Sequence, residues 1–120
     1  MSKYLPTNIE LRKKSRLLAV TFETGENFEL SCEFLRVFSP SADVKGHSPN
    51  QAVLQVGKEN AVIIEIEPIG NYAVRLIFSD GHDTGLYTWD YLYELGSMRD
   101  VYWSNYLSAL EAAGHERQIV

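Results

Sequence analysis

The sequence predicts an α+β fold in which two antiparallel β meanders form a sheet or sandwich with short helices packed on it. Apolar and polar residues alternate over 9–30 and again over 62–87, with Gly-containing turns between the runs, which is typical of antiparallel strands. After each run the apolar spacing changes to three and four residues, which is typical of helices. A chain of 120 residues can bury one core of its own, so a single domain spanning 1–120 is expected.

The first meander is expected to contain three strands. Residues 7–15 alternate apolar with polar side chains, residues 16–25 do the same, and a turn at Gly25 leads into a short third strand. The positions expected on the apolar faces are Ile9, Leu11, Leu18, Val20, Phe22, Phe28 and Leu30.

A short helix is expected over 30–38, where apolar residues recur at helical spacing. Ser31 can cap its N-terminus, and Pro40 requires it to end, because the residue before a proline is pushed out of helical geometry. Glu33 and Arg36 are expected to face water. The Ser-, Pro-, Gly- and Asn-rich segment 39–60 that follows is expected to be a long loop with a brief extended piece at 52–56.

The second meander is expected to begin with strands over 62–67 and 72–78. Asp80-Gly81 is a strong hairpin signal, and residues 84–88 would return as a third strand. The expected apolar faces carry Val62, Ile64 and Ile66 in the first strand, and Tyr72, Val74, Leu76 and Phe78 in the second.

Two helices should complete the chain. Thr88 can cap the first helix, and Gly96 is expected to end it. The second helix should cover about 98–113 and stop at Gly114. Its expected apolar face carries Val101, Tyr102, Tyr106, Leu107 and Leu110.

Charge and composition exclude several functional classes. The net charge of −5 and the pI of about 5.1 argue against a nucleic-acid partner, which would require a basic face. No long apolar run predicts a membrane span, and the N-terminus lacks a secretory pattern, so we expect a cytoplasmic protein without a membrane partner. The basic run Arg12–Arg16 is interpreted as a solvated turn, or alternatively as a contact for an acidic partner.

Few residues carry an obvious chemistry. Cys32 is the only cysteine, so no internal disulfide can form, and its apolar neighbours predict a buried, inert thiol. No phosphate loop, HExxH, paired CxxC or GxSxG motif occurs, so no catalytic residues are predicted. His82 between Asp80 and Asp83 leaves three interpretations open: a turn stabilised by local hydrogen bonds, a metal ligand, or a small enzyme that uses this turn.

Two motifs carry a family resemblance. "LRVFSPSADVKGH", followed by "LIFSDGHDTGLYTWDYLYELG", resembles the domain of unknown function 971 family (DUF971), which is similar to the N-terminal domain of gamma-butyrobetaine hydroxylase. The likeness covers about residues 9–106. It implies a single gamma-butyrobetaine hydroxylase N-terminal-like domain, and it does not extend to the hydroxylase's separate catalytic domain.

The resemblance also implies a metal position that this chain has altered. In the hydroxylase, the resembling domain holds a structural zinc through three cysteines and a histidine, and His82 matches that histidine. The cysteine positions fall on Ser39, Ser41 and Val44, which are poor zinc ligands. We therefore expect no cofactor, and we expect a hydrogen bond from Ser39 or Ser41 to His82. A remodelled zinc or iron site that uses Asp43 and His47 is the alternative.

These observations predict a non-catalytic accessory domain that binds a protein partner. Its contact surface would combine the 39–60 loop with the 80–87 hairpin, and the sequence is compatible with a homo-oligomer. The residues expected to contact the partner are Asp80, Asp83, Tyr87, Trp89 and Tyr91, with Tyr93 as a further aromatic anchor. The alternative is a domain that binds zinc or iron and is associated with iron–sulfur cluster handling or with oxygenase partners.

Overall fold

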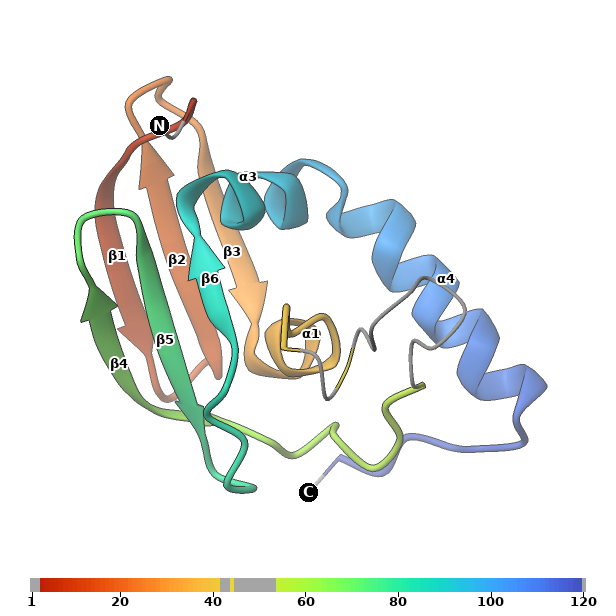
Figure 1. Ribbon diagram of the computed structural model, residues 1–120. Coiled ribbons are helices and arrows are strands. Elements are labelled where there is room, and N and C mark those ends of the chain that lie inside the picture. The colour runs from red at the N-terminus through yellow and green to blue at the C-terminus, as the bar shows by residue number, and fades with distance from the viewer. Residues whose placement is uncertain (1–2, 42–43, 45–53, 120) are drawn as a thin grey trace.

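In the part of the chain that the structure describes, six strands form two separate three-stranded antiparallel sheets (Figure 1). The computed structural model describes residues 3–41, 44 and 54–119. The first sheet joins β1 (Pro6–Arg12), β2 (Leu17–Phe22) and β3 (Asn27–Ser31) in that order, and the second joins β4 (Ile63–Ile69), β5 (Ala73–Phe78) and β6 (Leu86–Thr88). Helices pack beside the sheets, so the predicted α+β class with two antiparallel meanders is confirmed.

One hydrophobic core joins the two sheets. The central strand β2 contributes Leu18 and Val20, and β5 contributes Leu76 and Phe78; all four side chains are almost completely buried. The other buried members of this core come from β2 to β6 and from the two helical segments 32–37 and 89–97. The alternation read from the sequence therefore identifies the core faces of these central strands.

Of the apolar positions expected at β4, Val62 and Ile66 pack against the core as expected, but Ile64 does not. A β-bulge interrupts the pairing between Ile63 and Glu65. As a result Ile63 is buried at 2% exposure, whereas Ile64, expected on the apolar face, is 53% exposed. The extra residue of the bulge interrupts the alternation locally, so that Ile64 and Glu65 are both exposed, which simple alternation cannot anticipate. Tyr72, just before β5, is also exposed rather than part of the apolar face.

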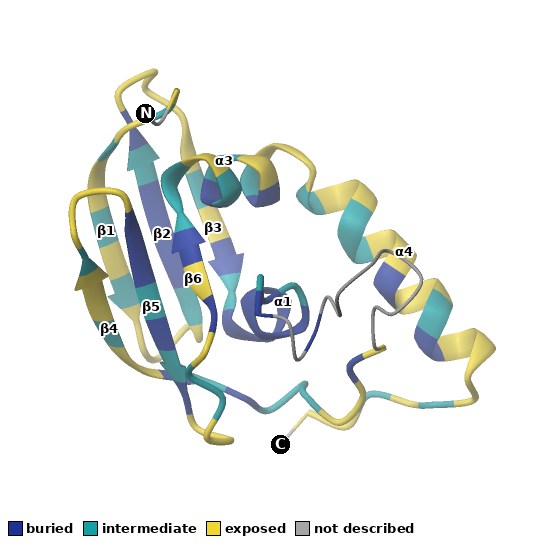
Figure 2. Cartoon of the chain, viewed as in Figure 1, coloured by how far each residue is buried: buried dark blue, intermediate teal, exposed yellow. Residues whose placement is uncertain are grey.

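Helix α1 (Cys32–Val37) begins where expected and ends before Pro40. The hydroxyl oxygen of Ser31 accepts a hydrogen bond from the Phe34 amide at 3.1 Å, which satisfies one of the unpaired N–H groups of the first turn. All six residues of α1 are buried (Figure 2). The expectation that Glu33 and Arg36 face water is therefore wrong.

Helices α3 (Trp89–Ser97) and α4 (Arg99–Ala112) follow β6. Thr88 caps α3 as expected, because its hydroxyl accepts from the Tyr91 amide at 3.2 Å. Gly96 does not end α3. It lies inside the last turn, where a Cβ would come within 2.3 Å of the Phe28 ring, so the glycine is required for close packing against β3. Gly114, with φ of 73°, follows the end of α4 as expected.

Helix α4 uses only part of its predicted apolar face. Tyr106 and Leu110 are buried, but Val101 and Leu107 are exposed at 52% and 37%. The helix extends away from the sheets, so fewer of its turns have a neighbour to pack against (Figure 1). In the described part of the chain, no helix is long and apolar enough to cross a membrane.

The segment before β4 contains no strand between Leu54 and Val56, where an extended piece was expected. The other two residues of that expected piece, at positions 52 and 53, lie outside the described residues.

Candidate functional site

The turn after β5 determines the position of His82. The carboxylate of Asp80 accepts a hydrogen bond from the His82 amide at 3.2 Å, and the Phe78 amide donates to the His82 carbonyl at 3.0 Å. Gly81 supplies the positive φ of 89° that this turn requires. The backbone of His82 is therefore held by its neighbours, which leaves the imidazole to reach another segment.

That segment is the one that follows α1. Ser39 is completely buried, and its Oγ lies 2.8 Å from Nε2 of His82. The Ser41 hydroxyl lies 2.7 Å from the Thr84 hydroxyl, and the Ser41 amide donates to the Ser39 Oγ at 3.3 Å. We call these four residues, Ser39, Ser41, His82 and Thr84, the polar junction. The predicted hydrogen bond between Ser39 and His82 is confirmed.

Gly85 allows the two segments of the polar junction to approach each other. A Cβ at this position would lie 2.4 Å from the Ser39 Oγ and 3.2 Å from the Pro40 Cδ. No larger residue fits there without displacing one of the segments. The sequence analysis did not single out Gly85, although a glycine directly before a short strand is a known sign of close backbone approach.

A charged cluster lies beside the polar junction. The Asp80 carboxylate accepts from Arg36 Nε at 2.8 Å and from Lys58 Nζ at 3.3 Å, and Arg36 also donates to the Gln55 side chain at 3.1 Å. Burial raises the pKa of Asp80, but the hydrogen bonds from Arg36 and from the His82 amide outweigh it and lower this pKa below its ordinary value. The carboxylate therefore stays ionised and serves as an acceptor.

A cavity of about 370 Å³ opens over this cluster. Its lining residues are Arg36, Lys58, Asp80, Gly81, His82, Asp83 and Thr84. The side chains that reach it are mostly charged or hydroxyl-bearing, so the cavity is suited to polar or charged groups of a ligand rather than to apolar ones.

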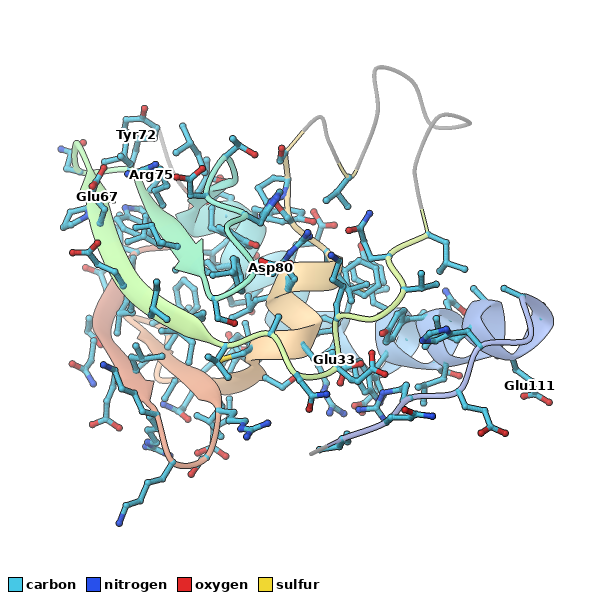
Figure 3. All side chains as sticks on the ribbon, turned by 90° about the horizontal axis from the view of Figure 1, so that it is seen from below. Glu33, Glu67, Tyr72, Arg75, Asp80 and Glu111 are labelled. Carbon is cyan, nitrogen blue, oxygen red and sulfur yellow. The ribbon has the colours of Figure 1, made fainter. Side chains whose placement is uncertain are left out.

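Asp83 belongs to a row of charges across the outer face of the second sheet. Its carboxylate lies 3.4 Å from Arg75, and Arg75 also binds Glu67 on β4 at 3.1 Å. Figure 3 shows Glu67 and Arg75 next to each other, away from Asp80. The structure thus separates the two aspartates that the sequence places around His82, because each is paired with a different arginine.

The aromatic residues expected to contact a partner differ in exposure. Tyr87 is fully buried and its hydroxyl donates to the Leu35 carbonyl, so its assignment as a surface anchor is wrong. Burial raises the pKa of Tyr87 far above its ordinary value. Trp89 and Tyr91 are half-buried and donate to the carbonyls of Asn71 and Phe38, at 2.7 and 2.6 Å.

Tyr93 is also half-buried and is fixed by two neighbours. Its ring stacks on Tyr4 with centroids 3.6 Å apart, and its hydroxyl donates to Glu26. The hydrogen bond to Glu26 raises the pKa of Tyr93 to about 12.

The donor set at the polar junction does not suit a structural zinc ion. Ser39 and Ser41 provide neutral hydroxyls, and Val44, at the third cysteine position, is a buried apolar residue. Across the described ranges, no group of three or more His, Cys, Asp or Glu side chains converges as metal ligands would. Asp43 and His47, the alternative ligands, lie outside those ranges. Cys32 is buried as expected, and burial raises its pKa.

The distance between Ser39 and His82 would suit a catalytic nucleophile and its general base. The Ser39 hydroxyl, however, is not accessible to a substrate. Ser39 has no exposed surface, so a substrate cannot reach its hydroxyl. Asp80 accepts from the His82 backbone. The arrangement is chemically suited to holding two segments together.

A second charged cluster lies at the N-terminal end of α1, where Glu33 stands in the first turn. The Glu33 carboxylate accepts from the Tyr106 hydroxyl at 2.9 Å and from Arg117 Nε at 2.8 Å. The Arg117 guanidinium lies 5.2 Å from the centroid of the Trp103 ring. We call this cluster, Glu33, Trp103, Tyr106 and Arg117, the tail contact, because it attaches the C-terminal segment to the core.

Sequence reasoning missed Glu33, Arg36 and Lys58 as partners in these clusters. Their ion pairs join residues 84, 44 and 22 positions apart, so no local pattern reveals them. The only signal was the central place of α1, a six-residue helix between two apolar meanders.

The family described as "Gamma-butyrobetaine hydroxylase-like, N-terminal" matches residues 9–93. The chain belongs to this family. The match contains both the α1 segment and the histidine turn, so the polar junction lies inside the region that defines the family. No curated protein matches the chain.

Solved structures agree with this assignment. Two proteins whose structures were determined in solution by NMR are 49% and 47% identical, each with a TM-score of 0.83; the matches cover 99% and 98% of this chain and 89% and 92% of theirs. A crystal structure of a protein of unknown function from Acidithiobacillus ferrooxidans, a member of the DUF971 family, is 38% identical with a TM-score of 0.64. That match covers 76% of this chain and 91% of the other.

Proposed function

We propose that this domain is a non-catalytic accessory module that binds a protein partner through the surface around the polar junction. The observation that carries the proposal is the cavity of about 370 Å³ bounded by Arg36, Asp80 and His82, whose side chains are already held by hydrogen bonds. Groups fixed before binding lose little conformational entropy on association, which favours affinity.

The hairpin from Asp80 to Tyr87 would supply the rest of the contact. Leu86 is 41% exposed on β6, close to the charged row formed by Arg75 and Asp83. An apolar side chain surrounded by charged ones is a common composition for a protein–protein interface. Trp89 and Tyr91 stand at the start of the next helix and remain predicted contacts.

Affinity capture with single-site variants tests this proposal. Leu86→Glu changes an exposed apolar residue of the hairpin, and Val101→Glu makes the same change at an exposed position of α4. We expect a protein captured from the source cell lysate to be lost with Leu86→Glu and retained with Val101→Glu. If both variants capture the same proteins in the same amounts as the unchanged domain, the proposed surface is wrong.

The alternative, a metal-binding domain associated with iron–sulfur cluster handling or oxygenase partners, has a separate test. It rests on the family match, which includes His82, and a metal bound there would replace the hydrogen bond between the His82 imidazole and Ser39. Metal analysis of protein purified without a histidine tag would show one equivalent of zinc or iron, lost in His82→Ala. A metal content far below one equivalent would contradict this alternative.

A further inference from the structure

A second cavity, of about 290 Å³, lies where the end of β1 meets the start of β4. Its lining residues are Leu11, Lys13, Arg16, Cys32, Val62, Ile63 and Ile64. Sites for whole small ligands commonly measure about 300–1,000 Å³. This cavity is at the lower end of that range, so it is suited to one anchoring side chain rather than to a large cofactor. We call it the basic groove.

The wall of the basic groove is apolar and partly exposed. The bulge in β4 turns Ile64 outward, and the side chain is 53% exposed at the rim. Leu11 and Val62 are half-buried beside it. Water therefore contacts apolar surface here that a second apolar side chain would cover, which is the driving force for docking.

The rim of the groove carries positive charge that the fold does not neutralise. Arg12 is paired with Glu10 and Glu29, whereas Lys13 and Arg16 form no salt bridge within the described ranges. Arg16 adopts a positive φ of 54°, and its carbonyl accepts from the Cys32 amide at 2.9 Å. Burial raises the pKa of the Cys32 thiol, and the nearby Arg16 charge lowers it, so this charge acts on the floor of the groove.

The acidic residues of β4 do not cancel this charge. Glu67 is hydrogen-bonded to Arg75, and the charge of Glu65 acts on the same arginine, so both carboxylates belong to the outer face of the second sheet. Glu33 and Glu59 line a neighbouring cavity together with Arg16, but Glu33 is paired with Arg117 and Glu59 accepts from the Gln118 amide. In a chain with a net charge of −5, the groove is thus a local basic site. Its complement is an acidic ligand.

The strands beside the groove indicate that the ligand is a peptide. β1 and β4 are both edge strands of their sheets. Edge strands can receive an extended chain, whose alternate side chains then enter pockets beside the strand. We propose that the basic groove binds an extended acidic peptide segment of a partner protein, with one apolar side chain in the cavity and carboxylates on Lys13 and Arg16. This surface is separate from the polar junction and does not depend on it.

Fluorescence anisotropy tests the proposal with a labelled eight-residue peptide that has a central Leu-Phe pair flanked by Glu and Asp. We expect it to bind in about 150 mM salt, and we expect versions with Gln for the acids, or Ala for the apolar pair, to bind at least about tenfold more weakly. Amide chemical shifts should change at Lys13, Arg16 and Ile64. Amide shifts confined to the polar junction would overturn the assignment of the site.

Single-site variants distinguish specific binding in the basic groove from unspecific electrostatic attraction to the basic turn. Lys13→Glu and Arg16→Asn should weaken binding about tenfold or more, and Asn tolerates the positive φ at position 16. Ile64→Ala should weaken it about fivefold, since Ile64 supplies exposed apolar surface. Lys14→Glu is the matched control: it makes the same charge change in the same turn, but Lys14 does not line the groove.

The control decides the outcome. A loss with Lys14→Glu below about threefold supports the groove. An equal loss with Lys13→Glu and Lys14→Glu, with Ile64→Ala unaffected, overturns the proposal in favour of unspecific charge attraction. Absence of binding by the acidic peptide at about 1 mM also overturns it, because that limit corresponds to less than about 4 kcal/mol of binding free energy.

Discussion

The two charged residues of α1 lie one turn apart, yet their surroundings differ. Glu33 and Arg36 are equally buried, each at 6% exposure. Glu33 belongs to the tail contact, at the wall of a cavity of about 230 Å³, whereas Arg36 reaches Asp80 at the wall of the cavity of about 370 Å³. A buried charge is tolerated only when it is paired, so both residues connect α1 to another segment.

This difference indicates that the tail contact stabilises the fold, whereas the charged cluster around Asp80 is able to bind a partner. In the tail contact, the Glu33 carboxylate accepts from Arg117 and Tyr106, and the Glu33 side chain is only 7% exposed. Beside the polar junction, Asp80 accepts from Arg36 and Lys58 at the wall of a cavity, and its side chain is 27% exposed, so a partner could add further hydrogen bonds there. The following predictions test this division.

Glu33→Ala should produce the largest effect. The substitution leaves the Tyr106 hydroxyl, which is buried, and the Arg117 guanidinium, whose side chain is 27% exposed, without their shared acceptor. Loss of an acceptor shared by a buried hydroxyl and a partly buried cation should cost about 3 kcal/mol of unfolding free energy. Urea unfolding followed by circular dichroism measures it. Glu111→Ala, at an exposed position of α4, is the control and should change the free energy by less than about 0.5 kcal/mol.

Gly85→Ala should have the next largest effect. We expect it to lower the free energy of unfolding by about 2 kcal/mol, because the added methyl group collides with Ser39. Adding Ser39→Ala to this variant removes the colliding oxygen. If the close approach of these two residues is the cause, the double variant should recover part of the loss. Recovery should be incomplete, since Pro40 and Tyr87 also lie 3.2 Å from the new Cβ. A double variant no more stable than the single one would contradict this explanation.

Arg36→Ala should cost less than Glu33→Ala, about 1.5 kcal/mol. Asp80 would keep its hydrogen bonds from Lys58 and from the His82 amide, whereas Glu33→Ala removes the acceptor of both the buried Tyr106 hydroxyl and Arg117. Unfolding in urea under the same conditions compares the two variants directly. Equal losses of unfolding free energy in Arg36→Ala and Glu33→Ala would contradict the proposed difference between the two ends of α1.

The sequence predicted the strands and their order well because alternation and turn residues are local properties. Leu18, Val20 and Phe78 were placed correctly in the core for this reason. Ile64 was misplaced, since a bulge depends on how two strands pair and not on the residues of one strand alone. Gly96 was misread as a helix end, because its true role is the contact with Phe28 on a distant strand.

The candidate site was predictable only in part. The family resemblance brought Ser39 and His82 together, and the hydrogen bond between them followed from ordinary polar chemistry. Neither the sequence nor the family resemblance could show that Arg36 would be buried beside Asp80. An ion pair between residues 44 positions apart exists only once the sheets have packed. Tyr87 failed as a surface residue for the same reason: an aromatic side chain suits a core and an interface equally well.

The pH dependence of the unfolding free energy tests the role of the Asp80 charge, where we expect the smallest effect. The folded-state pKa of Asp80 is lowered, whereas in the unfolded chain it should be near its ordinary value of about 3.9. The ionised carboxylate therefore contributes stability above about pH 4. This contribution is lost as the pH falls through the lowered folded-state pKa. We expect it to be the smallest of the four effects, because the side chain is partly exposed.

Asp80→Asn isolates this contribution from other acids. The pKa of Glu59 is also lowered, chiefly by the hydrogen bond from the Gln118 amide, so the total acid sensitivity of the protein has more than one source. The difference in unfolding free energy between the unchanged protein and Asp80→Asn should therefore be largest near pH 6 and should shrink toward pH 3. A difference that stays constant over this range would mean that Asp80 acts through its shape and not its charge. The polar junction would then resemble an ordinary packed turn, and its contrast with the tail contact would disappear.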